Sequence, residues 1–306
     1  MIARPARAVT LLGAVLFIQP AAAVEQTPGV AAAEYAANTR PDRIGRIIVP
    51  VQVNGRGPFQ FLLDTGANRT VLTPRLVEAL GLQTSRDNTV TLSGVTGAET
   101  VPTVLIEKVS AGDLVLENQR LPVAYALGND VDGVLGVDGF TNRRVLVDFT
   151  HQKVEIRAAR SVVALPEVKR TRTRFKFGLL MIAPGSVARI PVNAVIDTGS
   201  EHTLGNKVLH TALNLHDEAN QPGTEVIGQT LAKQIGVQHL LQNVVIADTQ
   251  TRYVNVVFGD FYMFKLWGLD KEPTLVIGMD LMGGLDTLVI DYGRHEIQFR
   301  PRKLYP

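Results

Sequence analysis

The sequence predicts an all-β fold with short helices, organised as two duplicated lobes. Three observations lead to this prediction. One motif occurs twice, as Asp64-Thr65-Gly66-Ala67 and as Asp197-Thr198-Gly199-Ser200, each time directly after an apolar run. The two aspartates are 133 residues apart (197 minus 64), and the helix signals that follow them are separated by the same 133 residues. Most other apolar segments have the length and composition of strands.

The composition is that of an ordinary globular protein. The chain has 306 residues, 45% hydrophobic and 20% charged, which is enough for two lobes or one large domain. The formal charge of +2 is too small to indicate a nucleic-acid partner. Cysteine is absent, which excludes disulfides, thiolate metal sites, a cysteine nucleophile and a lipid-anchored cysteine.

The N-terminus has the pattern of an export signal. Arg4 and Arg7 precede the apolar run 9–18, and Pro20 and three alanines follow it, so we expect a signal peptide over residues 1–23. The run is too short for a membrane anchor, which needs about 20 apolar residues. We therefore expect a periplasmic or secreted protein with no membrane contact after the signal is removed, and a flexible leader over 24–44.

Strands are expected throughout the first lobe, residues 45–160. An Asn54-Gly55 turn after the first strand indicates a hairpin. The expected strands are 47–53, 60–63, 89–92, 101–106, 145–149 and 154–156.

Each aspartate is followed by one short amphipathic helix. Nine residues after it comes an N-cap residue, Thr73 or Asn206, and seventeen residues after it comes a residue that tolerates a left-handed backbone, Gly81 or Asn214. Apolar residues at helical spacing lie between these two signals in both copies.

The second lobe, residues 177–306, ends in an expected hairpin of 287–292 and 296–299 around Gly293. About nine extra residues are expected within the aromatic stretch 251–274. Its aromatic side chains either cover the lobe's own core, which we favour, or line a substrate pocket. The basic segment 161–176 is expected to be a solvated linker, with an anion-binding patch as the alternative.

A second motif is also repeated: Val134-Leu135-Gly136 in the first copy and Val276-Ile277-Gly278 in the second. With both motifs in place, residues 45–300 resemble the pepsin and retropepsin superfamily of aspartic proteases. The resemblance implies an acid-protease fold, in which two lobes related by a pseudo-two-fold axis enclose the active site in a cleft. It also implies an aspartic endopeptidase. A single chain holding both lobes resembles a bacterial two-lobed retropepsin-like protease.

The resemblance makes Asp64 and Asp197 the catalytic pair. Two carboxyl groups a few ångströms apart cannot readily both ionise, so they share a proton and can serve as acid and base. A side-chain hydroxyl of Ser200 could donate to Asp197, which suggests that Asp197 is the more acidic partner. Supporting roles are expected for Thr65, Gly66, Ala67, Gly136, Thr198, Gly199, Ser200 and Gly278, with the threonines hydrogen-bonding across the lobe interface.

Two glycine-containing tips lie about 30 residues after the aspartates. By resemblance they are flaps that close over an extended peptide, and ordinary β-turns are the alternative. Neither tip has the tyrosine of a pepsin flap, which favours a fused retropepsin pair. The flap residues are Ser93, Gly94, Val95, Thr96 and Gly97 in the first copy, and Ile227, Gly228 and Gln229 in the second.

We expect no metal site and no cofactor. Four further aspartates recur in both copies, Asp138, Asp148, Asp280 and Asp291, and the repeat favours caps and turns over metal ligands. The six histidines include no His-Glu-x-x-His motif, and neither a serine-hydrolase elbow nor a Walker loop is present.

The expected partner is a peptide or protein substrate, bound by a monomer. Two other functions stay open at this point. A catalytically silent protein could keep the cleft and bind an extended peptide or another exported polymer. Alternatively, the duplicated β scaffold could serve as a structural or assembly module.

Overall fold

The computed structural model describes residues 37–38, 40–41, 45–127, 130–159, 168–218 and 221–302. The chain divides into two units, Met1–Glu34 and Tyr35–Pro306, and every described residue belongs to the second. The predicted signal peptide and most of the predicted leader lie outside the described residues. Among the residues described, no helix is long and apolar enough to cross a membrane.

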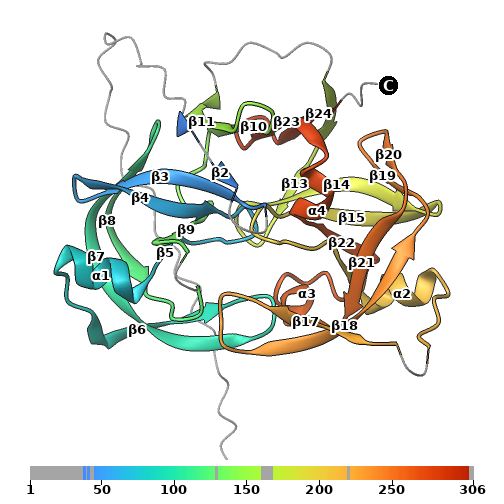
Figure 1. Ribbon diagram of the computed structural model, residues 1–306, viewed down its shortest axis with the longest axis horizontal. Coiled ribbons are helices and arrows are strands. Elements are labelled where there is room, and N and C mark those ends of the chain that lie inside the picture. Colours follow the sequence, from blue (N-terminus) through green and yellow to red (C-terminus); the bar gives the residue numbers. More distant parts are fainter. Residues whose placement is uncertain are drawn as a thin grey trace, which may run out of the picture. The chain divides into compact units, whose positions relative to one another are not determined.

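The described residues form mostly strands, arranged in three sheets (Figure 1). The first sheet comes from the N-terminal half, in the order β5-β9-β4-β3-β7-β6, with β2 beside β3 and β8 beside β7. Its strands are β2 (Arg40–Pro41), β3 (Ile47–Val53), β4 (Arg56–Leu63), β5 (Val71–Leu72), β6 (Ser85–Ser93), β7 (Ala98–Ala111), β8 (Leu114–Pro122) and β9 (Gly133–Leu135).

The second sheet comes from the C-terminal half, in the order β17-β18-β21-β16-β22-β15-β14-β19-β20, with β13 beside β14. Its strands are β13 (Arg174–Lys176), β14 (Leu180–Val187), β15 (Ile190–Ile196), β16 (Leu204–Asn206), β17 (Gly223–Ile227), β18 (Lys233–Leu241), β19 (Val244–Ile246), β20 (Thr249–Thr251), β21 (Val254–Gly259) and β22 (Thr274–Ile277).

The third sheet joins the two halves, in the order β1-β11-β10-β23-β24-β12. Its strands are β1 (Ala37–Asn38), β10 (Arg143–Asp148), β11 (Lys153–Ala158), β12 (Lys169–Arg172), β23 (Leu285–Asp291) and β24 (Glu296–Pro301). Strand β10 of the first half pairs with β23 of the second, so the lobes share one continuous hydrogen-bonded sheet.

Strand pairing around the two aspartates follows the same pattern in both halves. In the first half, β9 runs parallel to β4 and antiparallel to β5. In the second half, β22 runs parallel to β15 and antiparallel to β16. The duplication seen in the sequence is therefore a duplication of the local strand topology.

The helices are short; the predicted N-caps begin the first two, the predicted Gly81 ends the first, and the second ends at Leu213, one residue before the predicted Asn214. Helix α1 (Pro74–Leu80) begins at Thr73, whose hydroxyl accepts from the backbone N–H of Leu76, and ends at Gly81 with φ 70°. Helix α2 (Lys207–Ala212) begins at Asn206 in the same way, and Asn214 beyond it has φ 52°. The other two helices are α3 (Tyr262–Leu266) and α4 (Met279–Met282).

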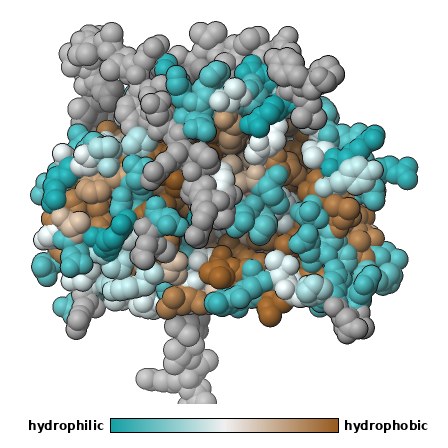
Figure 2. Space-filling model, viewed as in Figure 1, coloured by the Kyte–Doolittle hydropathy of each residue, from teal (hydrophilic) through white to brown (hydrophobic). Residues whose placement is uncertain are grey.

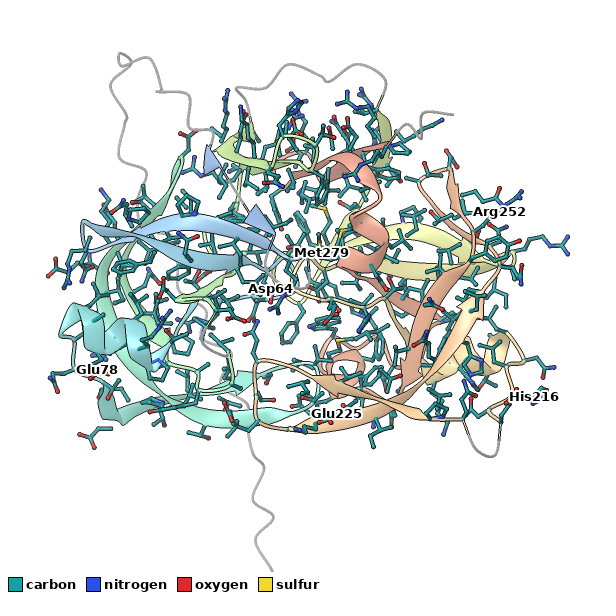
Figure 3. All side chains as sticks on the ribbon, viewed as in Figure 1. Asp64, Glu78, His216, Glu225, Arg252 and Met279 are labelled. Carbon is teal, nitrogen blue, oxygen red and sulfur yellow. The ribbon has the colours of Figure 1, made fainter. Side chains whose placement is uncertain are left out.

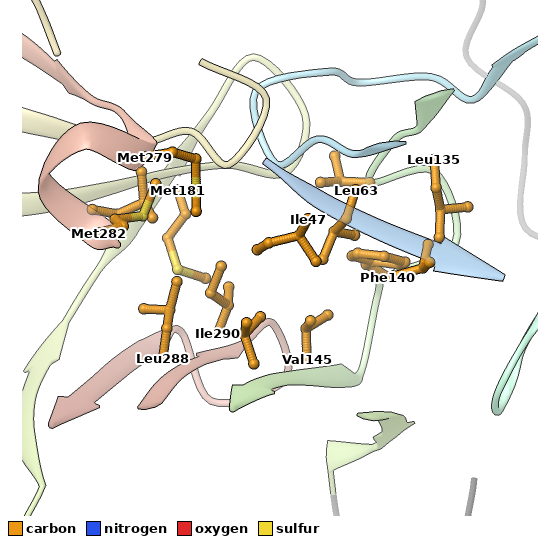
Figure 4. Packing of buried hydrophobic residues seen from close by; sticks show 14 of the residues in the cluster. Ile47, Leu63, Leu135, Phe140, Val145, Met181, Met279, Met282, Leu288 and Ile290 are labelled. Atoms are coloured by element: carbon orange, nitrogen blue, oxygen red, sulfur yellow. The ribbon is translucent and has the colours of Figure 1, made fainter. Parts of the chain in front are cut away.

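One large hydrophobic core extends through both halves and the sheet that joins them. Figure 4 shows part of it, with Ile47 and Leu63 from the first lobe near Val145 and Ile290 of the joining sheet. A smaller cluster in the second lobe holds Phe261, Phe264 and Trp267 beside β15 and β22. The aromatic stretch 251–274 is thus mainly core, as we favoured, and it forms β21 and α3.

Two segments differ from the expectation of flexible or linking chain. Within the predicted leader, β1 pairs with β11 and β2 pairs with β3. Within the predicted linker, β12 pairs with β24 and β13 pairs with β14, while residues 161–167 lie outside the described chain. The basic residues of β12 are largely exposed, since β12 is an edge strand.

Candidate active site

Asp64 and Asp197 follow the ends of two equivalent strands, β4 and β15. The backbone N–H of Asp64 donates to Leu135 O at 3.0 Å, and that of Asp197 donates to Ile277 O at 3.1 Å. Leu135 and Ile277 belong to the repeated apolar-apolar-glycine motifs. The two motifs of each half therefore meet in space, one holding the backbone of the other.

Four hydrogen bonds between Thr65 and Thr198 and their surroundings connect the two aspartate loops. Each threonine hydroxyl accepts from the backbone N–H of the other threonine, at 3.0 and 3.1 Å. Each hydroxyl also donates across the interface, from Thr65 to Ile196 O at 2.8 Å and from Thr198 to Leu63 O at 2.7 Å. Both side chains are buried, so the network fixes the position of one aspartate relative to the other.

Gly66 and Gly199 allow the opposite carboxyl group to approach. A Cβ at Gly66 would lie 2.5 Å from Asp197 Oδ2, and a Cβ at Gly199 would lie 2.4 Å from Asp64 Oδ2. Any side chain at either position would displace a carboxyl group. The glycines are therefore required by the pairing of the loops as well as by the turn itself.

Gly136 and Gly278 lie where a strand passes behind each loop, as the sequence predicted. A Cβ at Gly136 would lie 2.4 Å from the backbone carbon of Arg69, and one at Gly278 would lie 2.5 Å from that of His202. Arg69 and His202 are equivalent positions, 133 residues apart (202 minus 69). No side chain fits at either glycine.

The two carboxyl groups are buried, hydrogen-bonded to each other and unequal. Burial raises the pKa of both, and the charge of Asp64 raises the pKa of Asp197 further, well above its ordinary value of 3.8. Asp64 accepts from the N–H groups of Gly66 and Ala67 at 2.9 Å and also from Gln229 at 2.7 Å, all of which favour its charged form. These donors favour the charged form on Asp64 and the proton on Asp197.

Our expectation that Asp197 is the more acidic partner loses its structural basis. The expectation depended on a hydrogen bond from the hydroxyl of Ser200 to Asp197. That hydroxyl instead donates to His202 O at 2.8 Å. The backbone of Ser200 still hydrogen-bonds to Asp197, together with the N–H of Gly199.

Tyr292 belongs to a buried aromatic cluster and is influenced by the charges of the pair. Its ring stacks on Phe175 and meets Phe140 edge-on, and it is almost fully buried. Burial raises the pKa of Tyr292, and the nearby charges of Asp64 and Asp197 raise it further. Tyr292 therefore stays neutral, and no sequence motif indicated that it lies near the aspartates.

Both predicted flaps are hairpin tips, and they touch each other. The first joins β6 to β7 and is closed by the N–H of Gly94 donating to Gly97 O at 2.8 Å, and the second joins β17 to β18. Between the tips, the hydroxyl of Thr96 donates to Ala232 O at 2.6 Å. A Cβ at Gly94 would lie 3.3 Å from the backbone N of Gln229, and one at Gly228 would lie 3.0 Å from the backbone N of Val95.

Gln229, at the second tip, reaches the aspartates. Its side-chain Nε2 donates to Asp64 Oδ2 at 2.7 Å. The sequence placed Gln229 in a flap but gave no sign of this contact, because 165 residues separate the two side chains (229 minus 64). The side-chain amide thus occupies a position directly on the carboxyl pair.

A cavity of about 690 Å³ lies between the lobes and the flaps. Asp64 and Asp197 both line it (Figure 3 labels Asp64), together with the flap residues Ser93, Gly94, Val95, Ile227, Gly228 and Gln229. Ala67, Gly66, Gly199 and Ser200 also line it, whereas Thr65, Thr198, Gly136, Gly278, Thr96 and Gly97 do not. These six support the site from behind or hold the flaps together.

Apolar side chains from both lobes form much of the cavity wall. The first lobe contributes Val90, Leu92 and Val131, and the second contributes Met263, Leu266 and Trp267. Part of the predicted aromatic insertion therefore serves both as core and as cavity wall. On the face drawn in Figure 2, hydrophobic side chains also gather at the lower edge, in the region of β17 and β18, where Ile227 and Leu231 are exposed.

The four additional aspartates serve as local hydrogen-bond acceptors, as the repeat suggested. Asp138 accepts from the N–H and hydroxyl of Thr70, and Asp280 accepts in the same way from Thr203. Asp148 accepts from the N–H of His151, and Asp291 accepts from the N–H of Arg294, each at a turn. Each of these hydrogen bonds joins two residues of the same half of the chain.

Comparisons with known proteins agree with this geometry. Residues 49–138 match the family model described as aspartyl protease, and a search of curated proteins gave no match. Among solved structures, the chain is similar to the crystal structure of aspartic proteinase from Irpex lacteus. The TM-score is 0.55 and the identity 14%, over 89% of this chain and 98% of that chain.

The fold is therefore that of the aspartic proteases. The predicted resemblance to the pepsin and retropepsin superfamily is confirmed, with the aspartyl protease match lying in the first lobe. The match of residues 49–138 to the family model and the fold together support a protease-like function.

The raised pKa of Asp197 predicts how stability depends on pH. Above pH 3.8, the ordinary pKa, the unfolded chain releases a proton that the folded chain keeps. The free energy of unfolding therefore falls as pH rises from about 4 through the raised pKa. We expect Asp197→Asn to make this fall shallower between pH 4 and 7 in urea unfolding. Asp248→Asn, at an exposed aspartate, should leave it unchanged, and equal slopes in all three proteins would contradict the pKa shift.

Proposed function

We propose that this protein is an exported aspartic endopeptidase in which Asp64 and Asp197 activate one water molecule against a peptide carbonyl. The main support is the pair of buried carboxyl groups that share a hydrogen bond at the wall of a cavity between two lobes. This reaction needs a base and an acid in one place and uses no metal or organic cofactor.

In the proposed reaction, the two carboxyl groups take different roles. Charged Asp64 accepts a proton from water while the water oxygen bonds to the carbonyl carbon. Protonated Asp197 donates to the carbonyl oxygen, which gives a neutral tetrahedral diol. The C–N bond then breaks as the leaving nitrogen takes the proton from Asp64, and one hydroxyl of the diol returns its proton to Asp197 as the carboxylic acid forms. The proton count of the pair is restored after each cycle.

The flaps must move before a substrate can reach the carboxyl groups. Because Gln229 donates to Asp64 in the closed arrangement, a peptide must displace this side chain before its carbonyl can reach the carboxyl groups. An extended peptide could then hydrogen-bond to the flap backbones. The apolar residues of both cavity walls favour substrates with large apolar side chains near the cleaved bond.

The main alternative is a catalytically silent protein that binds an extended peptide or another exported polymer in the same cavity. A structural or assembly module is a further alternative, and it predicts no binding of a transition-state mimic that presents a central hydroxyl. The complete pairing of carboxyl groups favours the enzyme, because a binding protein has no need to keep two buried acids side by side, at a cost in stability.

A peptide library distinguishes these functions. We expect the purified protein to cut a diverse library at reproducible positions between pH 3 and 8, with an acid-leaning optimum. Asp64→Asn and Asp197→Asn should each lower kcat/KM by about 10²–10⁴-fold, the usual contribution of general acid–base catalysis. Asp248→Asn is the matched control. Binding of peptides without cuts in the wild type would support the silent binder, and cuts that persist in both variants would exclude this dyad.

Gln229 offers a test of the charge distribution. Its hydrogen bond lowers the pKa of Asp64, so Gln229→Ala should raise that pKa and move the acidic limb of the kcat/KM profile to higher pH. A hydrogen bond to a charged group is worth about 1.5 kcal/mol, which corresponds to a shift of about one pH unit. Gln250→Ala, in exposed strand β20, is the control. A limb that stays in place or moves to lower pH would contradict the role of Gln229.

Export can be tested separately from activity. If residues 1–23 are a signal peptide, mass spectrometry of the protein from the periplasm or medium of a Gram-negative expression host should find Val24 as the first residue. Replacing Ala21 and Ala23 by bulky residues should retain the uncut precursor. A protein that stays in the cytoplasm with residues 1–23 intact would contradict the proposal.

A further inference from the structure

A second cluster of titratable side chains lies in the C-terminal lobe, apart from the paired aspartates. His210 is in the last turn of α2, Asp217 is in the loop that follows, and His239 is in β18. Figure 3 labels His216, which neighbours Asp217 in sequence, far from Asp64 in that view. The proposed protease reaction uses none of these side chains.

The three side chains direct one atom each towards a common point. Asp217 Oδ1 lies 3.0 Å from His210 Nε2 and 2.8 Å from His239 Nε2, and the two Nε2 atoms lie 3.3 Å apart. These atoms form a nearly equilateral triangle. Ligand atoms around a tetrahedral Zn²⁺ with bonds of about 2.0–2.1 Å lie about 3.3 Å from one another, so the triangle has close to the size of one face of such a site.

The two imidazoles are held in place by regular structure and by packing. Phe258, a buried residue of β21, meets both rings edge-on, with centroids 5.4 Å from His210 and 5.8 Å from His239. The histidine side chains are only 18% and 12% exposed, whereas Asp217 is 49% exposed. The two nitrogens are therefore held in fixed positions, and the cluster is open to solvent on the side of Asp217.

The chemistry of the three groups suits a borderline divalent ion. Imidazole nitrogen and carboxylate oxygen are both common zinc ligands, and two histidines with one acid and an open position form a recognised zinc set. Asp217 Oδ1 is the one carboxylate oxygen in the triangle, and it lies within 3.0 Å of both Nε2 atoms. The carboxylate oxygen and the two imidazole nitrogens lie close enough to one another to coordinate one cation.

We propose that His210, Asp217 and His239 bind a divalent transition-metal ion, in the first instance Zn²⁺, with water as the fourth ligand. The ion would tie the end of α2 and its loop to β18, the strand that leads back from the second flap. Its role in this proposal is structural. Local ligand spacing does not indicate this site, because the ligands are brought together by the pairing of β18 with β21 and by α2.

The competing explanation is a hydrogen-bonded triad without metal. In that arrangement Asp217 Oδ1 accepts from both imidazoles, and no ion is taken up. The two explanations differ in a property that does not depend on protease activity, because only the first predicts stoichiometric uptake of metal.

The test uses the full chain after treatment with EDTA and removal of the chelator. At pH 7.5, isothermal titration with ZnCl₂ should give one Zn²⁺ per chain, and saturating zinc should raise the Tm by several degrees. Addition of CoCl₂ should give visible absorption bands of a tetrahedral Co²⁺ site. No saturable binding, or binding weaker than about 1 mM, would overturn the proposal.

Variants assign the ligands. His239→Gln and Asp217→Asn should each lower zinc affinity by at least about tenfold. Loss of a residue that merely supports a ligand already lowers metal affinity by about that much, so loss of a ligand itself should cost no less. His216→Ala is the matched control because it removes a neighbouring histidine outside the triangle. Urea unfolding without metal checks that each variant folds. Folded variants that bind zinc as tightly as the wild type would place the metal elsewhere and contradict the proposed site. The result leaves the proposed protease function unaffected in either case.

Discussion

The reciprocal hydrogen bonds between Thr65 and Thr198 are the constraint on which the rest of the site depends. They are buried, and each hydroxyl is both an acceptor from the opposite loop and a donor into the opposite half. An unsatisfied buried backbone group costs about 1–3 kcal/mol, so the loops cannot separate without exposing several such groups or leaving them unpaired. The two aspartates are therefore brought together by the backbone of their loops, and their mutual repulsion is overcome by structure around them.

Several other features follow from that enforced proximity. Because each carboxyl group lies against the glycine of the opposite loop, Gly66 and Gly199 have no room for a side chain. Because both acids are buried together, one of them keeps a proton, and the donors around Asp64 determine which one. The joining sheet of β10 and β23 then holds the two lobes in the orientation that the threonines require. Access to the carboxyl pair passes the flap tips, which are joined by the hydrogen bond from Thr96 to Ala232 O.

Sequence reasoning recovered the parts of the fold that are encoded locally. The hairpin at Asn54-Gly55 has positive φ at both residues, and the caps at Thr73 and Asn206 work as predicted, because turn and cap chemistry depends on neighbours in the chain. Strands β8, β14, β18 and β21 are among those that the sequence did not predict. Strand β18 has exposed polar residues at Lys233 and Gln238 and lacks a strong apolar run, so only its tertiary pairing reveals it.

The sequence likewise indicated some residues of the candidate site and not others. The repeat identified Asp64 and Asp197 as equivalent positions, and family resemblance supplied the threonine interactions that the structure contains. The hydroxyl of Ser200 was assigned to the wrong acceptor, because its rotamer is decided by the carbonyl of His202 and not by proximity in sequence. Gln229 and the cluster of His210, Asp217 and His239 depend on contacts between distant segments, which spacing alone does not encode.

The central claim is that Asp64 and Asp197 titrate as one unit. The most direct measurement is a ¹³C NMR pH titration of the protein labelled at the aspartate carboxyl carbons, with single Asn variants to assign the two signals. The account predicts two coupled steps in which both signals respond, one of them far above the ordinary aspartate pKa and belonging mainly to Asp197. Two independent transitions, each near 3.8 and each affecting one signal only, would contradict it.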